Sequence, residues 1–396
     1  MRTLLLVPLV LSLGAAASPR SATPKPRALV RDSALVAQAW AAIRDRYGDT
    51  TFGGRDWRAV GDSFVVRRSY ADVRAQLGAI REMLSRLHDP WTRLLRAEDF
   101  DALLGEASGG AHVGVGLPEL LCIDFDRTGR ELVVVTPVPG TAAARAGLRP
   151  GDVVTRIGTR RAAGLSLSEA AWLLRGARGS GIAVRVRRGG REHTVRLVRD
   201  SVPARRPAAT GRLVGGPDGV GYLALGWFTG SAGDEVRGLV DSLMRAGARR
   251  LVLDLRGNPG GSLAAAADVA GVFLGDVPIV SVVGRGAGGQ EVRGTAPALT
   301  RAPMAVLIDR GTASAAEVVA SALQHHRRAV LVGERSFGKG LVHSFERLPD
   351  GSALMLTSGR LHTPGGRDIL ALGVEPDVVA PAERQMARAM EAVKGE

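Results

Sequence analysis

Residues 304–340 read MAVLIDRGTASAAEVVASALQHHRRAVLVGERSFGKG. Residues 304–308 are continuously apolar and predict a buried strand, and the apolar residues of 315–325 recur at helical spacing. A second apolar run at 329–332 predicts the next strand. Strand, helix and strand in this order are typical of a parallel sheet whose faces are covered by helices, so this stretch predicts an α/β domain.

The same alternation continues on both sides of this stretch. We predict further buried strands at 221–225, 251–255 and 279–283, and helices at 234–246 and 263–273. Downstream, Pro349-Asp350-Gly351 is typical of a hairpin turn. Since 396 residues exceed what one hydrophobic core usually organises, we expect an α/β multidomain protein.

Two polar residues follow the strands of the first stretch. Ser314 comes after a small-residue turn and is expected at the N-terminus of the helix, where free N–H groups favour a developing oxyanion. Lys339 comes after the second strand, so neighbouring strand ends carry both residues to one edge of the sheet. A neutral lysine amine there could take the proton of the serine hydroxyl. Considered alone, a serine at this place is also an ordinary helix N-cap.

The lysine content favours the catalytic interpretation. Only three of the 53 basic residues are lysines, namely Lys25, Lys339 and Lys394. Lys25 lies near the start and Lys394 near the end, so Lys339 is the one lysine inside the expected folded region. Lysine can lose its proton when it is buried, whereas arginine in practice cannot. The pattern therefore indicates a Ser–Lys pair.

Two other chemistries fit parts of the pattern. A Ser–His–Asp triad stays open, because spacing alone does not exclude the histidines, which are His88, His112, His193, His325, His326, His343 and His362. Residues 333–339 nearly match the phosphate-binding pattern GxxxxGK[ST]. Position 340 is Gly, so the hydroxyl that would hold magnesium is missing, and a nucleotide-hydrolysing enzyme is not expected.

A glycine-rich turn provides a second candidate donor to an oxyanion. Residues 253–261 read LDLRGNPGG, a buried strand that continues into a turn before the helix at 263–273. Glycines let backbone N–H groups approach a ligand closely. A tight connection between strand and helix explains the turn equally well when it is considered alone.

Residues 105–199 have the pattern of a small β-domain. Short Val- and Leu-rich runs are broken by glycines, and one helix is predicted at 168–174. The predicted strands are 131–137, 152–157, 182–186 and 194–198. The sequence GVGL at 114–117 precedes them.

The N-terminal residues predict export. Residues 1–17 combine Arg2, an apolar run and a small-residue cleavage site, as a secretory signal peptide does. Cleavage of this peptide would leave a periplasmic or secreted protein, and no stable membrane insertion is expected, because the apolar run is too short to span a bilayer.

The remaining segments are bounded by composition and periodicity. Residues 18–31 are a Pro- and Ser-bearing linker, and apolar residues recur at helical spacing in a small helical domain at 32–104. Residues 200–215, with two prolines, are interpreted as a second linker. The α/β core is expected at 216–380 and a C-terminal helix at 381–396.

Composition is typical of a globular protein. Hydrophobic residues make up 45% of the chain and charged residues 23%. The formal net charge is +14, but the basic residues are spread along the chain, so no nucleic acid is expected as a partner. The single cysteine, Cys122, cannot form an intrachain disulfide and is expected to be a small buried hydrophobe.

Four segments, in order, resemble the signatures of the carboxy-terminal processing peptidases, the tail-specific S41 family. They are LVLDLRGNPGG (251–261), RGTASAAEVVASALQ (310–324), AVLVGERSFGKG (329–340) and LHTPGGRDILALGVEPDV (361–378). Residues 56–57 and 88–93 are similar to the N-terminal helical region of that family, and 105–199 are similar to its PDZ domain. The resemblance covers essentially the whole chain after the signal peptide.

The resemblance implies a fold and a set of roles. The core would be of the crotonase-like ββα type that the Clp proteases share. Ser314 would be the nucleophile and Lys339 the base, with Glu317 at an acidic position one helical turn after the nucleophile. Backbone N–H groups of Ala315 and Gly260 would form the oxyanion hole. No metal or cofactor is implied.

The PDZ resemblance implies how substrates are recognised. Backbone N–H groups of the loop Gly114, Val115, Gly116 and Leu117 would hold the terminal carboxylate of protein or peptide substrates with apolar C-termini. The implied function is a serine endopeptidase that cleaves exported proteins recognised by their C-terminal tails. A non-catalytic binding or adaptor protein is the alternative.

One position departs from the family pattern. Many relatives have a glutamine four residues after the lysine, where it orients the amine, whereas this chain has His343. A histidine can also donate or accept a hydrogen bond, so the departure is compatible with activity. An exposed strand histidine without a catalytic role is the other interpretation.

Overall fold

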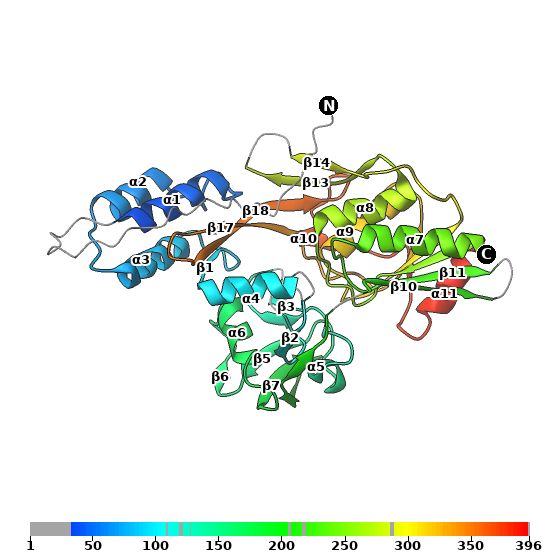
Figure 1. Ribbon diagram of the computed structural model, residues 1–396, viewed down its shortest axis with the longest axis horizontal. Helices are drawn as coiled ribbons and strands as arrows, with labels where there is room; N and C mark the ends of the chain where they lie inside the picture. Colours follow the sequence, from blue (N-terminus) through cyan, green and yellow to red (C-terminus); the bar gives the residue numbers. More distant parts are fainter. Residues whose placement is uncertain are drawn as a thin grey trace, which may run out of the picture. The chain divides into compact units, whose positions relative to one another are not determined.

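The computed structural model describes residues 33–107, 110–118, 122–126, 128–204, 207–215, 219–285 and 289–394 (Figure 1). The expected signal peptide and first linker lie outside these residues. The chain divides into two compact units. The first unit extends to Phe100 and includes Val342–Gly359, and the second comprises Asp101–Leu341 with Arg360–Glu396.

The first unit is mainly helical. It contains α1 (Ala34–Arg46), α2 (Trp57–Gly61), the π-helical turn η1 (Asp62–Val66), α3 (Val73–Ser85) and β1 (Arg93–Leu95). A hairpin from a distant part of the sequence, β17 (Leu341–Arg347) and β18 (Ala353–His362), contributes to the same unit. Here β1 pairs antiparallel with β18, and Leu348, Leu354 and Leu356 are in one core cluster with the helices.

The β-domain of the second unit has the predicted strands. Its sheet follows the order β3 (Ile123–Phe125), β4 (Leu132–Val134), β5 (Val153–Ile157), β7 (Gly181–Arg188) and β8 (Arg191–Val198), and β6 (Arg160–Arg161) pairs with β5. Its helices are α5 (Ala142–Arg145) and α6 (Leu167–Leu174), while α4 (Ala97–Ala107) begins in the first unit and ends in the second. At the start of α6, Ser166 and Glu169 exchange hydrogen bonds as a capping box, which fixes where this helix begins.

Residues 200–215, expected to be a linker, contain two strands. β9 (Asp200–Val202) pairs with β2 (His112–Gly114), and β10 (Ala209–Val214) pairs antiparallel with β11 (Val220–Leu225). The neighbouring prolines made the composition of this segment similar to that of a linker. Pairing with strands from elsewhere satisfies backbone N–H and C=O groups that a linker would leave to water.

The α/β core is a six-stranded sheet. Its order is β10, β11 (Val220–Leu225), β12 (Arg250–Asp254), β15 (Met304–Ile308), β16 (Val330–Gly333) and β19 (Val378–Val379). All neighbours pair in parallel except β10 and β11. This arrangement confirms the parallel sheet that residues 304–340 predicted.

Helices cover this sheet. α7 (Ala232–Arg245), α8 (Leu263–Leu274) and α9 (Ala315–His325) lie side by side (Figure 1). α11 (Gln385–Ala392), within the expected C-terminal helix, contacts β15 and β16, and its Ala389 belongs to one buried apolar cluster with Val252 and Ala305 of the sheet. The apolar strands are therefore buried, as their composition requires.

One predicted strand of the α/β alternation is not part of this sheet. β13 (Pro278–Gly284) forms an antiparallel hairpin with β14 (Gln290–Arg293), so the chain passes from β12 to β15 without it. The apolar run at 279–283 specified a strand but contained nothing that specified its partner. The short helix α10 (Ile369–Leu372) completes the core.

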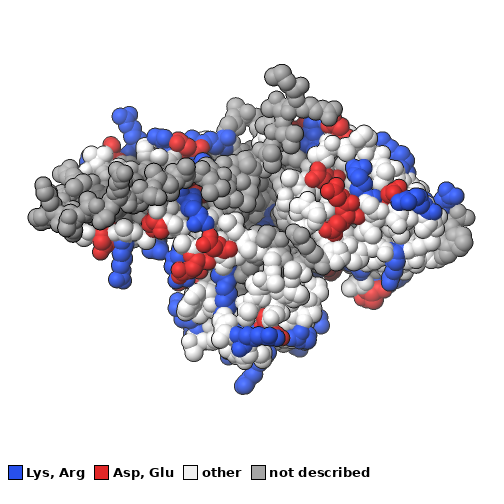
Figure 2. Space-filling model, viewed as in Figure 1, with Lys and Arg blue, Asp and Glu red and all other residues white. Residues whose placement is uncertain are grey.

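The surface carries both signs of charge. On the face in Figure 2, Lys and Arg are interspersed with Asp and Glu and form no continuous basic stripe. Cys122 is fully buried, as expected of a small hydrophobe. No helix in the described part of the chain has both the length and the apolar character needed to cross a membrane.

Candidate active site

Ser314 lies in a strained turn between β15 and α9. It is the N-cap of α9, which begins at Ala315 as predicted, and its backbone has φ 53° and ψ −119°. A left-handed φ is unfavourable for a residue with a side chain and persists only where the surroundings enforce it. Ala313 and Ala315 are buried on either side, while Ser314 itself is partly exposed. The turn therefore keeps the serine partly accessible to solvent while its neighbours are buried.

The turn that carries Lys339 lies beside it. β15 and β16 pair in parallel with Ile308 opposite Gly333, so both turns leave the sheet at the same edge. The N–H group of Phe337 donates to the carbonyl of Thr312 at 2.9 Å and joins the two turns directly. The structure thus brings the segments of Ser314 and Lys339 together, as the order of strands predicted.

Glu317 connects these turns through its carboxylate. Oε2 accepts the N–H groups of Ser314 at 2.8 Å and of Lys339 at 2.7 Å. Oε1 accepts the N–H of Gly338 at 2.7 Å and the hydroxyl of Ser336. Complete burial raises the pKa of Glu317 above its usual range, and the four donors oppose that rise. Its contacts are with the backbone that carries the pair, so it positions both residues.

A further hydrogen bond and a close contact hold the lysine turn. Ser336 Oγ accepts the N–H of Val374 at 2.7 Å while it donates to Glu317. A methyl group built on Gly340 would overlap the backbone of Leu370 in α10. Position 340 has no room for the Ser or Thr of a phosphate-binding loop, which removes the nucleotide-binding interpretation.

The lysine amine has a partner that the sequence analysis missed. Lys339 Nζ donates to Oδ2 of Asp124, which lies on β3 of the β-domain. The side chains are 9% and 3% exposed, so this is a buried ion pair. A lone acid in an apolar strand requires a partner when it is buried. That requirement, together with the one lysine of the folded region, is the signal from which the pair could have been predicted.

The glycine-rich turn approaches Ser314 closely. Gly260 has φ 101°, and a methyl group built on it would lie 2.7 Å from Ser314 Cβ and 2.9 Å from Ala315 N. The N–H of Gly260, a predicted oxyanion donor, donates instead to Asn258 Oδ1 at 2.9 Å. The N–H of Ala315, the other predicted donor, has no acceptor among the residues that the structure describes.

Asn258 is a second residue that the sequence analysis missed. Its side chain is fully buried, and Nδ2 donates to the carbonyl of Leu225 at 2.7 Å. The backbone carbonyl of Asn258 accepts the N–H of Ala313 at 2.9 Å. Asn258 therefore links the glycine turn to β11 and to the serine turn. A buried amide in a glycine-rich turn is a weak signal, because many turns contain asparagine.

The four predicted peptide-binding residues line a groove of the β-domain. Gly114, Val115, Gly116 and Leu117 face the end of α6, with His112, Pro118, Ala171, Leu174 and Arg175 completing the lining. Gly116 has φ 89°, and a side chain there would overlap Thr141. The loop thus requires glycine for both its conformation and its packing.

Three of the candidate histidines lie on other elements than the serine and lysine turns. His343 lies on β17, and this part of the chain belongs to the first unit, whereas Ser314 and Lys339 belong to the second. Its part in catalysis therefore stays a prediction. His325 and His326 lie at the C-terminal end of α9, opposite the end that carries Ser314.

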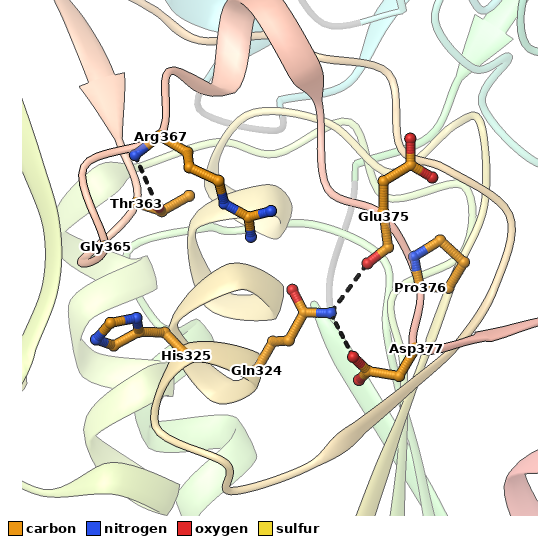
Figure 3. A pocket seen from close by; sticks show the side chains of 8 residues that line it. All are labelled: Gln324, His325, Thr363, Gly365, Arg367, Glu375, Pro376 and Asp377. Atoms are coloured by element: carbon orange, nitrogen blue, oxygen red, sulfur yellow. Dashed lines mark hydrogen bonds between the residues drawn. The ribbon is translucent and has the colours of Figure 1, made fainter.

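A separate cavity of about 360 Å³ lies near that C-terminal end (Figure 3). Gln324 and His325 meet the segments 363–367 and 375–377 there, and Gln324 Nε2 donates to Glu375 O and Asp377 Oδ1. It contains none of the predicted catalytic residues. Among the described residues, no group of three or more His, Cys, Asp or Glu side chains is arranged to hold a metal ion.

Comparisons with known proteins agree with this arrangement. A family model described as peptidase family S41 matches residues 219–380, and one described as a PDZ domain matches residues 133–188. A carboxyl-terminal-processing protease of Picosynechococcus sp. is 37% identical over 351 residues, which are 88% of this chain and 83% of that protein. The carboxyl-terminal-processing peptidase 2, chloroplastic, of Arabidopsis thaliana is 32% identical over 91% of this chain and 71% of its own length.

A solved structure shows the same architecture. The photosystem II D1 C-terminal processing protease superposes with a TM-score of 0.81 at 30% identity, covering 92% of this chain and 99% of that one. Together with the adjacent serine and lysine turns, this identity and coverage show that the chain belongs to peptidase family S41 and is a carboxyl-terminal-processing serine protease with a PDZ domain.

Proposed function

We propose that this protease works by Ser–Lys catalysis, with Ser314 as nucleophile and Lys339 as general base. The observation that carries the proposal is the bond pattern of Glu317, whose Oε2 accepts the N–H groups of both residues. A nucleophile and its base must keep a fixed mutual geometry, and one shared acceptor provides it. His343 stays a candidate for orienting the amine.

The chemistry would be acyl transfer. Neutral Lys339 takes the hydroxyl proton as Ser314 Oγ attacks the peptide carbonyl, and the developing oxyanion meets the N–H of Ala315 at the helix N-terminus. The N–H of Gly260 contributes only if it leaves Asn258. The protonated lysine then gives its proton to the leaving amine, and water hydrolyses the acyl-enzyme.

We also propose the finer fold, the location and the substrates. The parallel sheet with its covering helices supports a core of the crotonase-like ββα type found in Clp proteases. The apolar N-terminal residues support export by a cleaved signal peptide to the periplasm or beyond. Substrates would then be exported proteins with apolar C-termini, bound through the loop Gly114–Leu117 of the PDZ domain.

Replacing the nucleophile tests the catalytic proposal. Ser314→Ala should abolish both peptide cleavage and labelling by a fluorophosphonate, with little change in melting temperature, because the hydroxyl is partly exposed and contributes little packing. Ser321→Ala, which changes a serine of the same helix whose hydroxyl donates to the carbonyl of Val318, should keep both. Turnover by the Ser314 variant would exclude the assignment. Tail binding without turnover in the wild type would favour the adaptor alternative.

A further inference from the structure

The hydrogen-bond ladder between β12 and β15 continues beyond the ends of the two strands. The N–H of Leu255 donates to the carbonyl of Leu307 at 2.9 Å. Bonds between parallel strands recur at every second residue, so the next donor is the N–H of Gly257 and its expected acceptor is the carbonyl of Asp309. Gly257 does donate to Asp309, at 2.8 Å, but to the side-chain oxygen Oδ1. A carboxylate thus takes the place of a backbone carbonyl in the ladder.

The carbonyl of Asp309 has another donor because the chain turns at this point. It accepts the N–H of Thr312 at 3.0 Å, in the turn that leads to Ser314. Oδ1 accepts the N–H of Gly311 at 2.9 Å in addition to that of Gly257, so one oxygen bonds to the backbone of the serine turn and of the glycine-rich turn. The chain can therefore leave the sheet sharply while the two turns stay joined.

These bonds fix the glycine-rich turn relative to the nucleophile. Gly257 precedes Asn258, whose backbone carbonyl accepts the N–H of Ala313 at 2.9 Å. Both bonds hold the start of the turn against the serine turn. Gly260 follows in the same turn, so close to Ser314 that a methyl group built on Gly260 would lie 2.7 Å from Ser314 Cβ. A displacement of about 1 Å at a catalytic group can cost about 100-fold in rate, so the anchoring of this turn affects catalysis.

We propose that Asp309 is a positioning residue for the oxyanion hole, and that its carboxylate holds the glycine-rich turn at the distance from Ser314 that the transition state requires. Asp309 acts through the backbone of Gly257 and Gly311 and takes no part in proton transfer. Its role differs from that of Glu317, which joins the serine turn to the lysine turn. The inference rests on the proposed acyl-transfer mechanism.

Asp309→Ala tests this role in the full-length protein, because it removes the acceptor of both N–H groups. The loss concerns the transition state, so kcat for a peptide substrate should fall by about 100-fold while KM changes by less than roughly twofold. Labelling of Ser314 by a fluorophosphonate should slow as well, because the phosphoryl oxygen of the reagent requires the same donors.

Asp309→Asn and Asp309→Glu separate geometry from charge. The amide keeps an oxygen that can accept both N–H groups, and burial, which raises the pKa of Asp309 above its usual range, disfavours the charge that the amide removes. Asp309→Asn should therefore fold and keep kcat within about tenfold of wild type, since the hydrogen bonds lose only the assistance of the charge. Asp309→Glu keeps the charge but moves it by one methylene group, so it should lose more kcat than Asp309→Asn. This pair tests the proposal even if Asp309→Ala does not fold.

Asp377→Ala is the matched control. Asp377 also accepts a backbone N–H of the core sheet, that of Leu331 at 2.8 Å, and it bonds to Gln324 at the end of α9 opposite Ser314. The substitution should lower stability in urea unfolding, because it too removes an acceptor of a backbone N–H. It should leave kcat at the wild-type level.

The outcomes separate this role from the mechanism on which it rests. Wild-type kcat in folded Asp309→Ala, a change in KM alone, or a loss in Asp309→Asn as large as in Asp309→Glu would overturn the role of Asp309. Fluorophosphonate labelling of Ser314→Ala at the wild-type rate would refute the proposed function instead, since Asp309 is intact in that variant.

Discussion

At the residue scale, the site depends on groups that are buried and charged. Glu317 has no exposed surface and accepts four hydrogen bonds, three of them from backbone N–H groups. Backbone donors cannot turn away when their acceptor changes, so the site is sensitive to the chemistry of this one side chain.

Glu317→Gln should therefore reduce kcat by about 100-fold and destabilise the fold by about 1–3 kcal/mol, because one amide NH₂ would face N–H donors. The matched control is Glu334→Gln, which removes a half-exposed carboxylate paired with Arg310 and should change stability by no more than about 0.5 kcal/mol. Urea unfolding and initial rates measure the two effects. Wild-type kcat in the Glu317 variant would show that the turns are held by other contacts.

Lys339→Arg should be as inactive as Lys339→Ala. The charge is kept, but a guanidinium does not give up its proton and cannot become a base. Lys394→Arg is the control for the loss of a lysine as such and should cleave at the wild-type rate. Substantial cleavage by Lys339→Arg would make Lys339 a structural cation and place the base elsewhere.

His343 is tested by a pair of substitutions. If it orients the amine, His343→Gln should keep substantial activity, whereas His343→Ala should lose at least about tenfold, the scale of one positioning hydrogen bond. Single-turnover rates on one peptide compare the two. An equal loss in both variants would favour a histidine that transfers the proton itself.

At the scale of elements, two turns and a glycine-rich loop meet where parallel strands end. Gly260→Ala should abolish fluorophosphonate labelling, because the new methyl group would displace Ser314 and Ala315. Gly247→Ala is a close control: Gly247 has φ 98°, against 101° at Gly260, but nothing lies within 4 Å of an added methyl group. It should cost about 1 kcal/mol of stability and leave labelling intact. Labelling of the Gly260 variant at the wild-type rate would mean that the loop does not support the nucleophile.

The elements that sequence predicted best are those fixed by local signals. α9 begins after Ser314 and ends at His325 as expected, since apolar spacing and a capping position define it. β9 was mistaken for linker because its partner, β2, lies far back in the chain. β10 and β13 pair with the strands that follow them, β11 and β14, and their composition did not reveal this pairing. Local sequence specifies an extended segment, while residues outside that segment specify its pairing.

The candidate site was also predicted incompletely, because some of its contacts join segments that are far apart in the sequence. The order of strands placed Ser314 and Lys339 at one edge, and family resemblance supplied Glu317 and the groove loop. Neither indicated that the lysine amine would meet Asp124, because that contact depends on how the PDZ domain packs against the core. Asn258 was missed for a similar reason, since its partners Leu225 and Ala313 come from two other segments.

At the scale of the whole molecule, the proposed tail-binding loop and the proposed catalytic pair lie in different domains of one chain. Helix α6 lines the groove of the PDZ domain and contacts β3, and β3 carries the carboxylate that pairs with the lysine. If the groove binds chain ends as proposed, we expect the chain end that it accepts to decide which proteins are cut.

The last prediction concerns that chain end. The loop Gly114–Leu117 can turn its N–H groups toward a ligand because Gly116 adopts φ 89°, and such donors are best satisfied by a carboxylate. Calorimetry on the full-length Ser314→Ala variant, which cannot cleave, should show that a peptide ending in Ala or Val binds more tightly than its amidated twin. The expected difference is about 1.5–3 kcal/mol, the range for hydrogen bonds to a charged group. Gly116→Ala, whose methyl group would overlap Thr141, should erase the difference, whereas Gly140→Ala, with positive φ and open space, should keep it. Equal affinities of the two peptides for the parent protein would mean that the groove does not bind chain ends, and that substrates are selected in the protease core.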